Sequence, residues 1–176
     1  PVQDFGNAFS TYVAQNYGAG KRDRIRRGMR DAVLGAFVFC FVISVLVVGF
    51  ARPLMSLFLD ESSAEAVVVG VGYLRIEASF YFGIGLLFLF YGYFRAVNKP
   101  GVSVVLTVVS LGMRVLLAYT LSAVEGIGVT GIWMSVPIGW FLADAAGVVF
   151  YVKNRRAADR EGCDNGALHT GCYRNA

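Results

Sequence analysis

The sequence has few charged residues for its length. Only 16% of its 176 residues are Asp, Glu, Lys or Arg, whereas soluble domains have about 25%. Hydrophobic residues make up 56% of the chain. A soluble domain of this size has too large a surface for its volume to bury so much apolar area. The same composition excludes a disordered chain, so we expect an integral membrane protein.

Histidine and cysteine are also scarce, with one and three residues respectively. Three unclustered cysteines do not form a disulfide framework. Cys163, His169 and Cys172 offer three metal ligands in principle, but their spacing matches no zinc pattern, and we expect no metal and no cofactor. The sequence has no G-x-S-x-G, H-E-x-x-H, P-loop or C-x-x-C motif. We therefore do not expect an enzyme.

Long hydrophobic runs dominate what remains. Four of them are long enough, or nearly so, to cross the hydrocarbon core, which is about 30 Å thick. We predict an all-α membrane protein with four transmembrane helices. They are expected at about residues 32–51, 66–95, 102–122 and 128–152.

The first twenty residues are amphipathic instead of uniformly apolar. Polar side chains recur there at spacings of three and four, which places them on one helical face. We predict the end of a transmembrane helix that faces a polar cavity, with these residues lining a path for substrate or ions. A structural hydrogen-bond network between helices is the alternative. The candidates are Gln3, Asp4, Asn7, Thr11 and Gln15.

Basic residues are confined to alternate connections. Of the 16 Lys and Arg, 13 lie in 21–31, 94–100 and 153–176. The positive-inside rule places these connections in the cytoplasm, so we expect a multi-pass protein of the cell's inner (plasma) membrane whose partner is the bilayer. The net charge of +4 then needs no nucleic acid. We expect 21–31 to be a basic loop and 153–176 to be a disordered polar tail.

Charged residues at membrane depth are costly and mark functional or paired groups. Arg114 interrupts the third run and fits a functional and a structural role equally well. For Asp144, in the fourth run, we favour a buried ion pair with a cytoplasmic-side arginine such as Arg95. Arg75 and Glu77 lie near the outer end of the second run, and we interpret them as solvated anchors.

The predicted spans also contain aromatic and small residues with candidate roles. Tyr81, Tyr91, Trp133 and Trp140 are able to stack on an aromatic or cationic solute, although packing is the commoner role. Pro137 should kink the last helix and, beside Gly139, provides either a hinge or a fixed bend. A small residue at every fourth position predicts a close-packing seam, formed by Gly131, Ser135, Gly139, Ala143 and Gly147.

Four short motifs resemble one family of transporters. They are QNYGAGK at 15–21, YFRAVNKP at 93–100, RVLLAYTL at 114–121 and GIGVTGIWMSVPIGW at 126–140. In this order and with this topology they resemble the multidrug and toxic compound extrusion (MATE) family. The resemblance covers about residues 1–152. It implies that the chain holds the end of the eighth helix and helices nine to twelve.

The resemblance also implies a function. Members of the family export drugs and organic cations by alternating access, in exchange for H⁺ or Na⁺. We therefore expect a fragment of a C-terminal lobe, whose partner is the missing N-terminal lobe. Ala96 stands where the family often has glycine. Residues 78–94 lack the carboxylate that some Na⁺-coupled members carry in the tenth helix, so the resemblance places coupling on a carboxylate of the absent first helix.

Two other functions remain open. A lipid-linked oligosaccharide flippase of the same superfamily should have a cavity rich in cationic groups, and only Arg114 is deep here. A small oligomeric four-helix scaffold or channel would have to begin with an amphipathic half-helix.

Overall fold

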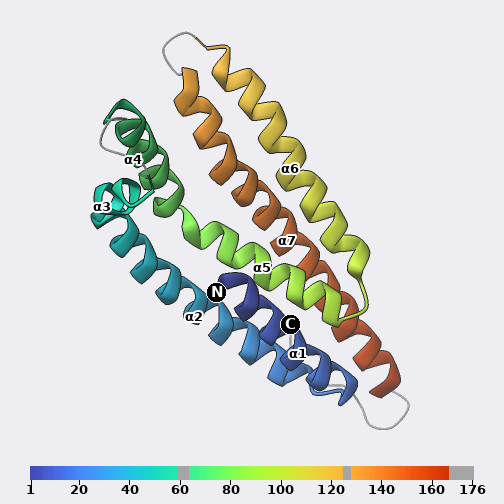
Figure 1. The fold of residues 1–176 in the computed structure, drawn as a ribbon. Helices are drawn as coiled ribbons and strands as arrows, with labels where there is room; N and C mark the ends of the chain where they lie inside the picture. The colour runs from blue at the N-terminus through green and yellow to red at the C-terminus, as the bar shows by residue number, and fades with distance from the viewer. Residues whose placement is uncertain (59–63, 125–127, 167–176) are drawn as a thin grey trace, which may run out of the picture.

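A computed structural model describes residues 1–58, 64–124 and 128–166 of the chain. All regular secondary structure in these ranges is α-helical, as the composition predicts (Figure 1). The helices are α1 (Val2–Gly18), α2 (Arg22–Gly49), α3 (Ala51–Ser56), α4 (Ala64–Ser79), α5 (Tyr81–Ala96), α6 (Pro100–Ser122) and α7 (Gly128–Gly166).

The membrane-crossing helices correspond to the four predicted runs. Among the described residues α2, α6 and the Gly128–Ala157 part of α7 are each long and apolar enough to cross a bilayer. The pair α4 and α5 passes the same test together and is bent by 50° at its break. The described part of the chain therefore holds three continuous helices able to span a bilayer and, counting the bent pair as one, a fourth that is broken.

Two boundaries differ from those that the sequence predicts. The basic segment 21–31 is almost wholly helical, because α2 begins at Arg22 and carries Arg and Met, which favour helices. Helix α7 continues to Gly166, whereas a disordered tail was expected from residue 153. Alanine and arginine are abundant in 155–160, and a helix extends readily once it is nucleated.

The break between α4 and α5 falls at Phe80, without a proline. Helical hydrogen bonds are lost at such a break, and in a membrane the freed carbonyls need other partners. The Ser44 hydroxyl of α2 supplies one, since it donates to the carbonyl oxygen of Ala78 at 2.5 Å. Phenylalanine rings lie on both sides of the break, and Phe80 and Phe82 each contact Phe141 of α7.

Helix α5 is the centre of the bundle. It lies between the α1–α2 pair and the long antiparallel α6–α7 pair and contacts all four helices (Figure 1). Its buried side chains include Leu87, Leu89, Phe90 and Phe94, which belong to one hydrophobic core with residues of α1, α2, α6 and α7. The central position of α5 explains why its hydrophobic residues continue around the whole helix.

Small residues allow the helices of the bundle to approach closely. The five seam residues of α7 predicted from the sequence are all buried. A Cβ on Gly139 would lie 2.8 Å from the Ser110 carbonyl oxygen of α6, and one on Gly147 would lie 2.6 Å from the Phe90 ring of α5. Helix α7 continues without interruption through the buried Pro137.

The QNYGAGK motif forms the C-terminal cap of α1. Gly20 has a positive φ of 68°. Its N–H donates to the Tyr17 carbonyl oxygen at 3.1 Å, and the Lys21 N–H donates to the Asn16 carbonyl oxygen at 2.9 Å. These two bonds define a Schellman motif, which satisfies carbonyls that the helix end leaves free. The motif therefore needs glycine at position 20.

The YFRAVNKP motif ends α5 in the same way. Asn98 is in the left-handed region with a φ of 57°, which asparagine tolerates better than most residues. The Asn98 N–H donates to the Arg95 carbonyl oxygen at 3.4 Å, and the Lys99 N–H donates to the Phe94 carbonyl oxygen at 2.9 Å. Since the left-handed residue is Asn98, Ala96 in place of the family's glycine causes no strain.

Candidate functional site

Helix α1 has one buried face and one polar exposed face. The buried face comprises Val2, Gly6, Phe9, Val13 and Asn16. The five candidates predicted from the sequence, Gln3, Asp4, Asn7, Thr11 and Gln15, are all exposed. We call these five residues the α1 polar face. The structure brings them together on one side of a single helix, and the Asp4 side chain is 87% exposed.

The packing of α1 against α5 fixes the direction of this face. A Cβ on Gly6 would lie 2.8 Å from the Phe88 carbonyl oxygen, and a Cβ on Gly92 would lie 3.4 Å from the Ser10 side chain. Backbone contact on one side of α1 leaves its polar side facing away from the bundle. Small residues recur at every fourth position of α1, but only Gly6 and Ser10 take part, because Ala14 and Gly18 are exposed.

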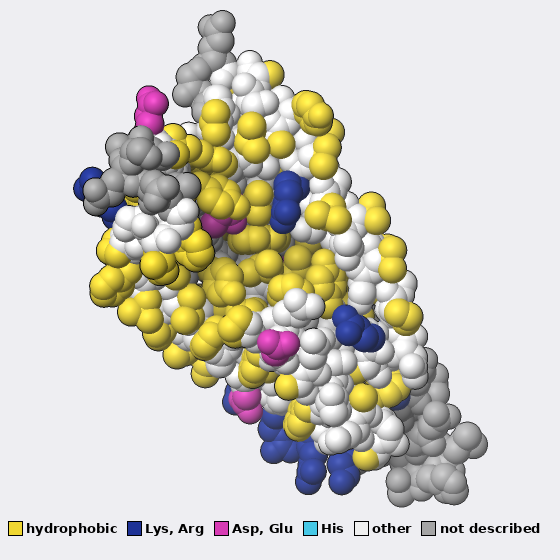
Figure 2. All heavy atoms as spheres, viewed as in Figure 1, with side chains coloured by type: hydrophobic (Ala, Val, Ile, Leu, Met, Phe, Trp, Pro, Cys, Tyr) yellow, Lys and Arg dark blue, Asp and Glu magenta, His cyan; other side chains and the backbone are white. Residues whose placement is uncertain are grey.

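The exposed surface of α2 has the opposite character. Its outward side chains are large and apolar, which suits contact with lipid tails: Leu34, Phe37, Val38, Phe41, Val42 and Val45. Polar side chains are costly in contact with lipid. The α1 polar face therefore belongs against water or against another part of the protein. In Figure 2 few hydrophobic side chains show on the surface over α1, and a hollow lined by hydrophobic side chains lies beside it.

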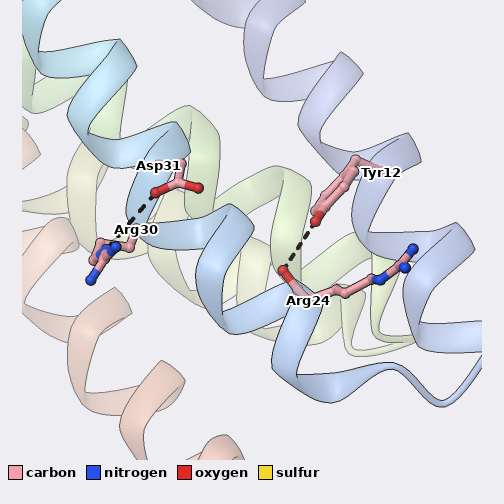
Figure 3. Close-up of polar contacts among 4 residues, drawn as sticks. All are labelled: Tyr12, Arg24, Arg30 and Asp31. Carbon is pink, nitrogen blue, oxygen red and sulfur yellow. Dashed lines mark hydrogen bonds and ion pairs between the residues drawn. The ribbon is translucent and has the colours of Figure 1, made fainter.

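Basic side chains gather at the end of the molecule where α1 meets α2 (Figure 2). There the Tyr12 hydroxyl of α1 donates to the Arg24 carbonyl oxygen of α2 at 3.0 Å (Figure 3). The nearby pair Arg30–Asp31 is exposed, with 3.8 Å between its charged groups (Figure 3). The basic connection 94–100 and the C-terminal part of α7 meet at the same end. The Lys99 ammonium group donates a hydrogen bond to the side-chain oxygen of Asn154 on α7.

The remaining predicted candidates lie elsewhere in the bundle. Tyr81 and Tyr91 of α5 and Arg114 of α6 are half-buried. The Tyr91 hydroxyl accepts a hydrogen bond of 3.2 Å from Thr107. Within the described ranges, no hydrogen bond or ion pair joins these three residues to the α1 polar face. Trp140 is buried and Trp133 packs edge-on against Tyr73, so both tryptophans have packing roles here.

Arg114 faces an acidic residue on a neighbouring helix. Glu77 of α4 is half-buried, and its Oε1 is fully buried without a hydrogen-bond partner in the described structure. Arg114 is close enough to interact electrostatically with Glu77 and Tyr73. The interpretation of Glu77 as a solvated anchor was therefore wrong, because its Oε1 is shielded from water. Arg75 is exposed, as expected.

The expected ion pair between Asp144 and Arg95 is also absent. Arg95 is exposed at the end of α5, whereas Asp144 is 5% exposed within α7. Neither carboxylate oxygen of Asp144 has a hydrogen-bond partner among the described residues. The prediction failed because helix depth alone does not say which way a side chain points.

Sequence reasoning missed the break at Phe80 and the Ser44 hydrogen bond that supports it. A signal was present, since a straight helix over 66–95 would be about 45 Å long, well beyond the hydrocarbon thickness of about 30 Å. Excess length indicates tilt or a bend. It does not indicate where the bend falls or which neighbouring hydroxyl satisfies it.

No group of three metal-ligating side chains occurs in the part of the chain that the structure describes. His169 and Cys172 lie outside the described residues, and so does the side chain of Cys163.

The fold and this surface define a multi-pass α-helical membrane protein with one polar helix face turned away from its core. The chain belongs to the MatE family, whose model matches residues 1–120. It is 25% identical over 138 residues to the probable multidrug resistance protein YoeA of Bacillus subtilis (strain 168). That match covers 78% of this chain and 29% of the relative, so the chain spans less than a third of that protein's length. No solved structure matches it.

Proposed function

We propose that this chain is most of the C-terminal lobe of a MATE-type antiporter that exports drug-like compounds or organic cations in exchange for H⁺ or Na⁺. Membership of the MatE family and similarity to a probable multidrug resistance protein support transport. The α1 polar face carries the rest of the argument, because it is exposed where the neighbouring α2 surface is apolar.

On this proposal the α1 polar face lines a central cavity shared with an N-terminal lobe. The lobes rock against each other around the bound substrate, as in other alternating-access transporters. Asp4 supplies a negative charge that attracts a cation, and the amides and hydroxyl of Gln3, Asn7 and Thr11 hydrogen-bond to polar parts of the substrate. The basic ends of the helices then lie in the cytoplasm, and the protein is in the inner membrane of the cell.

The flippase alternative is less well supported. A pyrophosphate-bearing lipid needs cationic partners, whereas the α1 polar face carries a carboxylate and no base. Among the described residues the one deep cation, Arg114, is close enough to interact electrostatically with Glu77 instead.

The proposal is tested by efflux of a fluorescent organic cation from cells that express the complete reading frame containing this chain. We expect efflux that collapses when the ion gradients are dissipated. D4N and N7A should slow it, while V38A on the lipid-facing side of α2 should not. A correctly inserted protein that exports no organic cation would refute the proposal and favour a scaffold or channel.

A further inference from the structure

Asp144 is the most isolated carboxyl group of the described spans. It lies on α7, is 5% exposed, and has no hydrogen-bond partner for Oδ1 or Oδ2 in the described structure. Its Oδ2 faces the backbone of α5, since a Cβ on Gly83 would lie 3.8 Å from this oxygen. The same Cβ would lie 3.4 Å from Trp140 and 3.6 Å from the Phe141 ring. The carboxyl group therefore sits in an apolar contact between two helices.

The charged and titratable groups on the helices packed against α7 do not compensate it. They are Glu65, Tyr73, Arg75 and Glu77 on α4, Tyr81, Tyr91, Tyr93 and Arg95 on α5, and Arg114 and Tyr119 on α6. Within the described residues none of them forms a hydrogen bond or ion pair with Asp144. Arg114 of α6 is close enough to Glu77 and Tyr73 to interact electrostatically with them.

An ionised carboxylate in such a place is very costly, whereas the neutral acid is tolerated. The apolar surroundings therefore hold Asp144 as a protonated carboxylic acid while the helices are packed as they are here. Neither carboxylate oxygen has a polar partner among the described residues, and a proton, unlike a metal cation, needs no further ligands.

Asp144 lies beside the broken span, where a movement of the helices would change its surroundings. Gly83 lies three residues after the break at Phe80, where the helix axis turns by 50°. Phe80 at the break and Phe82 just after it both pack on Phe141, three residues before Asp144 on α7. A change of angle at the break would therefore alter the surroundings of Asp144 directly. Broken helices beside coupling-ion sites are a recurring feature of secondary transporters.

We propose that Asp144 is a proton-binding group of this lobe, which takes up one proton when exposed to water and holds it when α5 and α7 close on it. The step is a simple protonation, in which the carboxylate plus one proton gives the neutral acid. The proposal rests on the antiport function proposed above. It adds a proton site within this chain to whatever carboxylate the absent lobe supplies.

Protonation is measured directly by infrared spectroscopy on the complete protein in lipid nanodiscs. At neutral pH ordinary aspartates are ionised, because their usual pKa is about 3.9. A carbonyl-stretch band from a protonated carboxyl group therefore reports a buried acid. We expect D144N to remove one such band. D31N, at an exposed carboxylate of the basic end, should leave the spectrum unchanged. A neutral-pH spectrum unaffected by D144N overturns the proposal.

Transport by the same variants in proteoliposomes separates the proton site from the antiport function. We expect D144N to lose accumulation of an organic cation driven by a pH gradient and to keep gradient-free exchange of that cation, while D31N keeps both. Retained gradient-driven accumulation, or loss of exchange as well, overturns the role of Asp144. If the unaltered protein moves no organic cation, the antiport function fails, while the infrared band still decides whether Asp144 binds a proton.

Discussion

The backbone of Gly92 on α5 lies directly against the carbonyl oxygen of Gly6 on α1, so that any Cβ on Gly92 would overlap this oxygen. No side chain separates the two helices at this point. The contact fixes the rotation of α1 and so points its polar face away from the bundle. Backbone-to-backbone contact of this kind is how small residues hold membrane helices together.

Replacement of Gly92 by alanine should therefore destabilise the α1–α5 contact. We expect a loss of about 1–3 kcal/mol, the usual cost of overpacking a close contact, measured as a lower midpoint of thermal unfolding in lipid nanodiscs. Gly112→Ala on α6 is the matched control, because nothing lies within 4 Å of a Cβ there. Equal midpoints for the two variants would show that the α1–α5 contact is not tight.

Gly20 and Gly18 provide a second matched pair. Gly20→Ala should cost about 1–2 kcal/mol, because its left-handed φ strains any residue with a Cβ. Gly18→Ala should be neutral or slightly stabilising, since Gly18 is the last residue of α1 and nothing lies near it. Urea-induced unfolding measures both. If Gly18→Ala proves the more damaging, the Schellman cap at the end of α1 is wrong.

Ser44 should support the break between α4 and α5. In Ser44→Ala the Ala78 carbonyl oxygen loses its donor, and hydrogen bonds between membrane helices contribute about 0.6 kcal/mol on average and up to about 1.7. We expect faster hydrogen exchange of the amides around Phe80. Ser56→Ala removes only a local, exposed bond to Pro53 and should leave this region unchanged. Equal exchange in both variants would contradict the supporting role.

The Glu77–Arg114 interaction should make the effects of substituting these two residues on the unfolding free energy non-additive. Arg114→Gln removes the cation beside a partly buried carboxyl group, so it should destabilise the protein more when Glu77 is present than in the E77Q background. A double-mutant cycle of unfolding free energies should give a coupling energy on the order of 1 kcal/mol. Additive effects would mean that the two charges act independently.

The sequence predicted the main features of the fold because they depend on local patterns. The lengths of the hydrophobic runs predicted the transmembrane helices. Polar residues at spacings of three and four predicted the polar face of α1. These patterns depend on helix geometry and on transfer between water and lipid. The four-residue repeat of α7 likewise predicted which of its residues would be buried, from Gly131 to Gly147.

Apart from the two helix boundaries, the errors concern which side of a helix meets which neighbour. Glu77 faces into the bundle, and Asp144 lies against Gly83 instead of pairing with Arg95. The sequence also does not show the break at Phe80, which is supported by Ser44 from a helix more than thirty residues earlier. No local pattern contains that information, because the donor and the freed carbonyl meet only after packing.

The central claim is that the α1 polar face lines a water-filled path, and cysteine labelling tests it most directly. In the complete protein without its native cysteines, N7C and T11C should react with a charged, membrane-impermeant thiol reagent. V38C, exposed on the apolar side of α2, and V13C, buried against α5, should not react. Labelling of V38C with N7C and T11C unlabelled would place α1 against lipid or inside a packed interface, and would contradict the account.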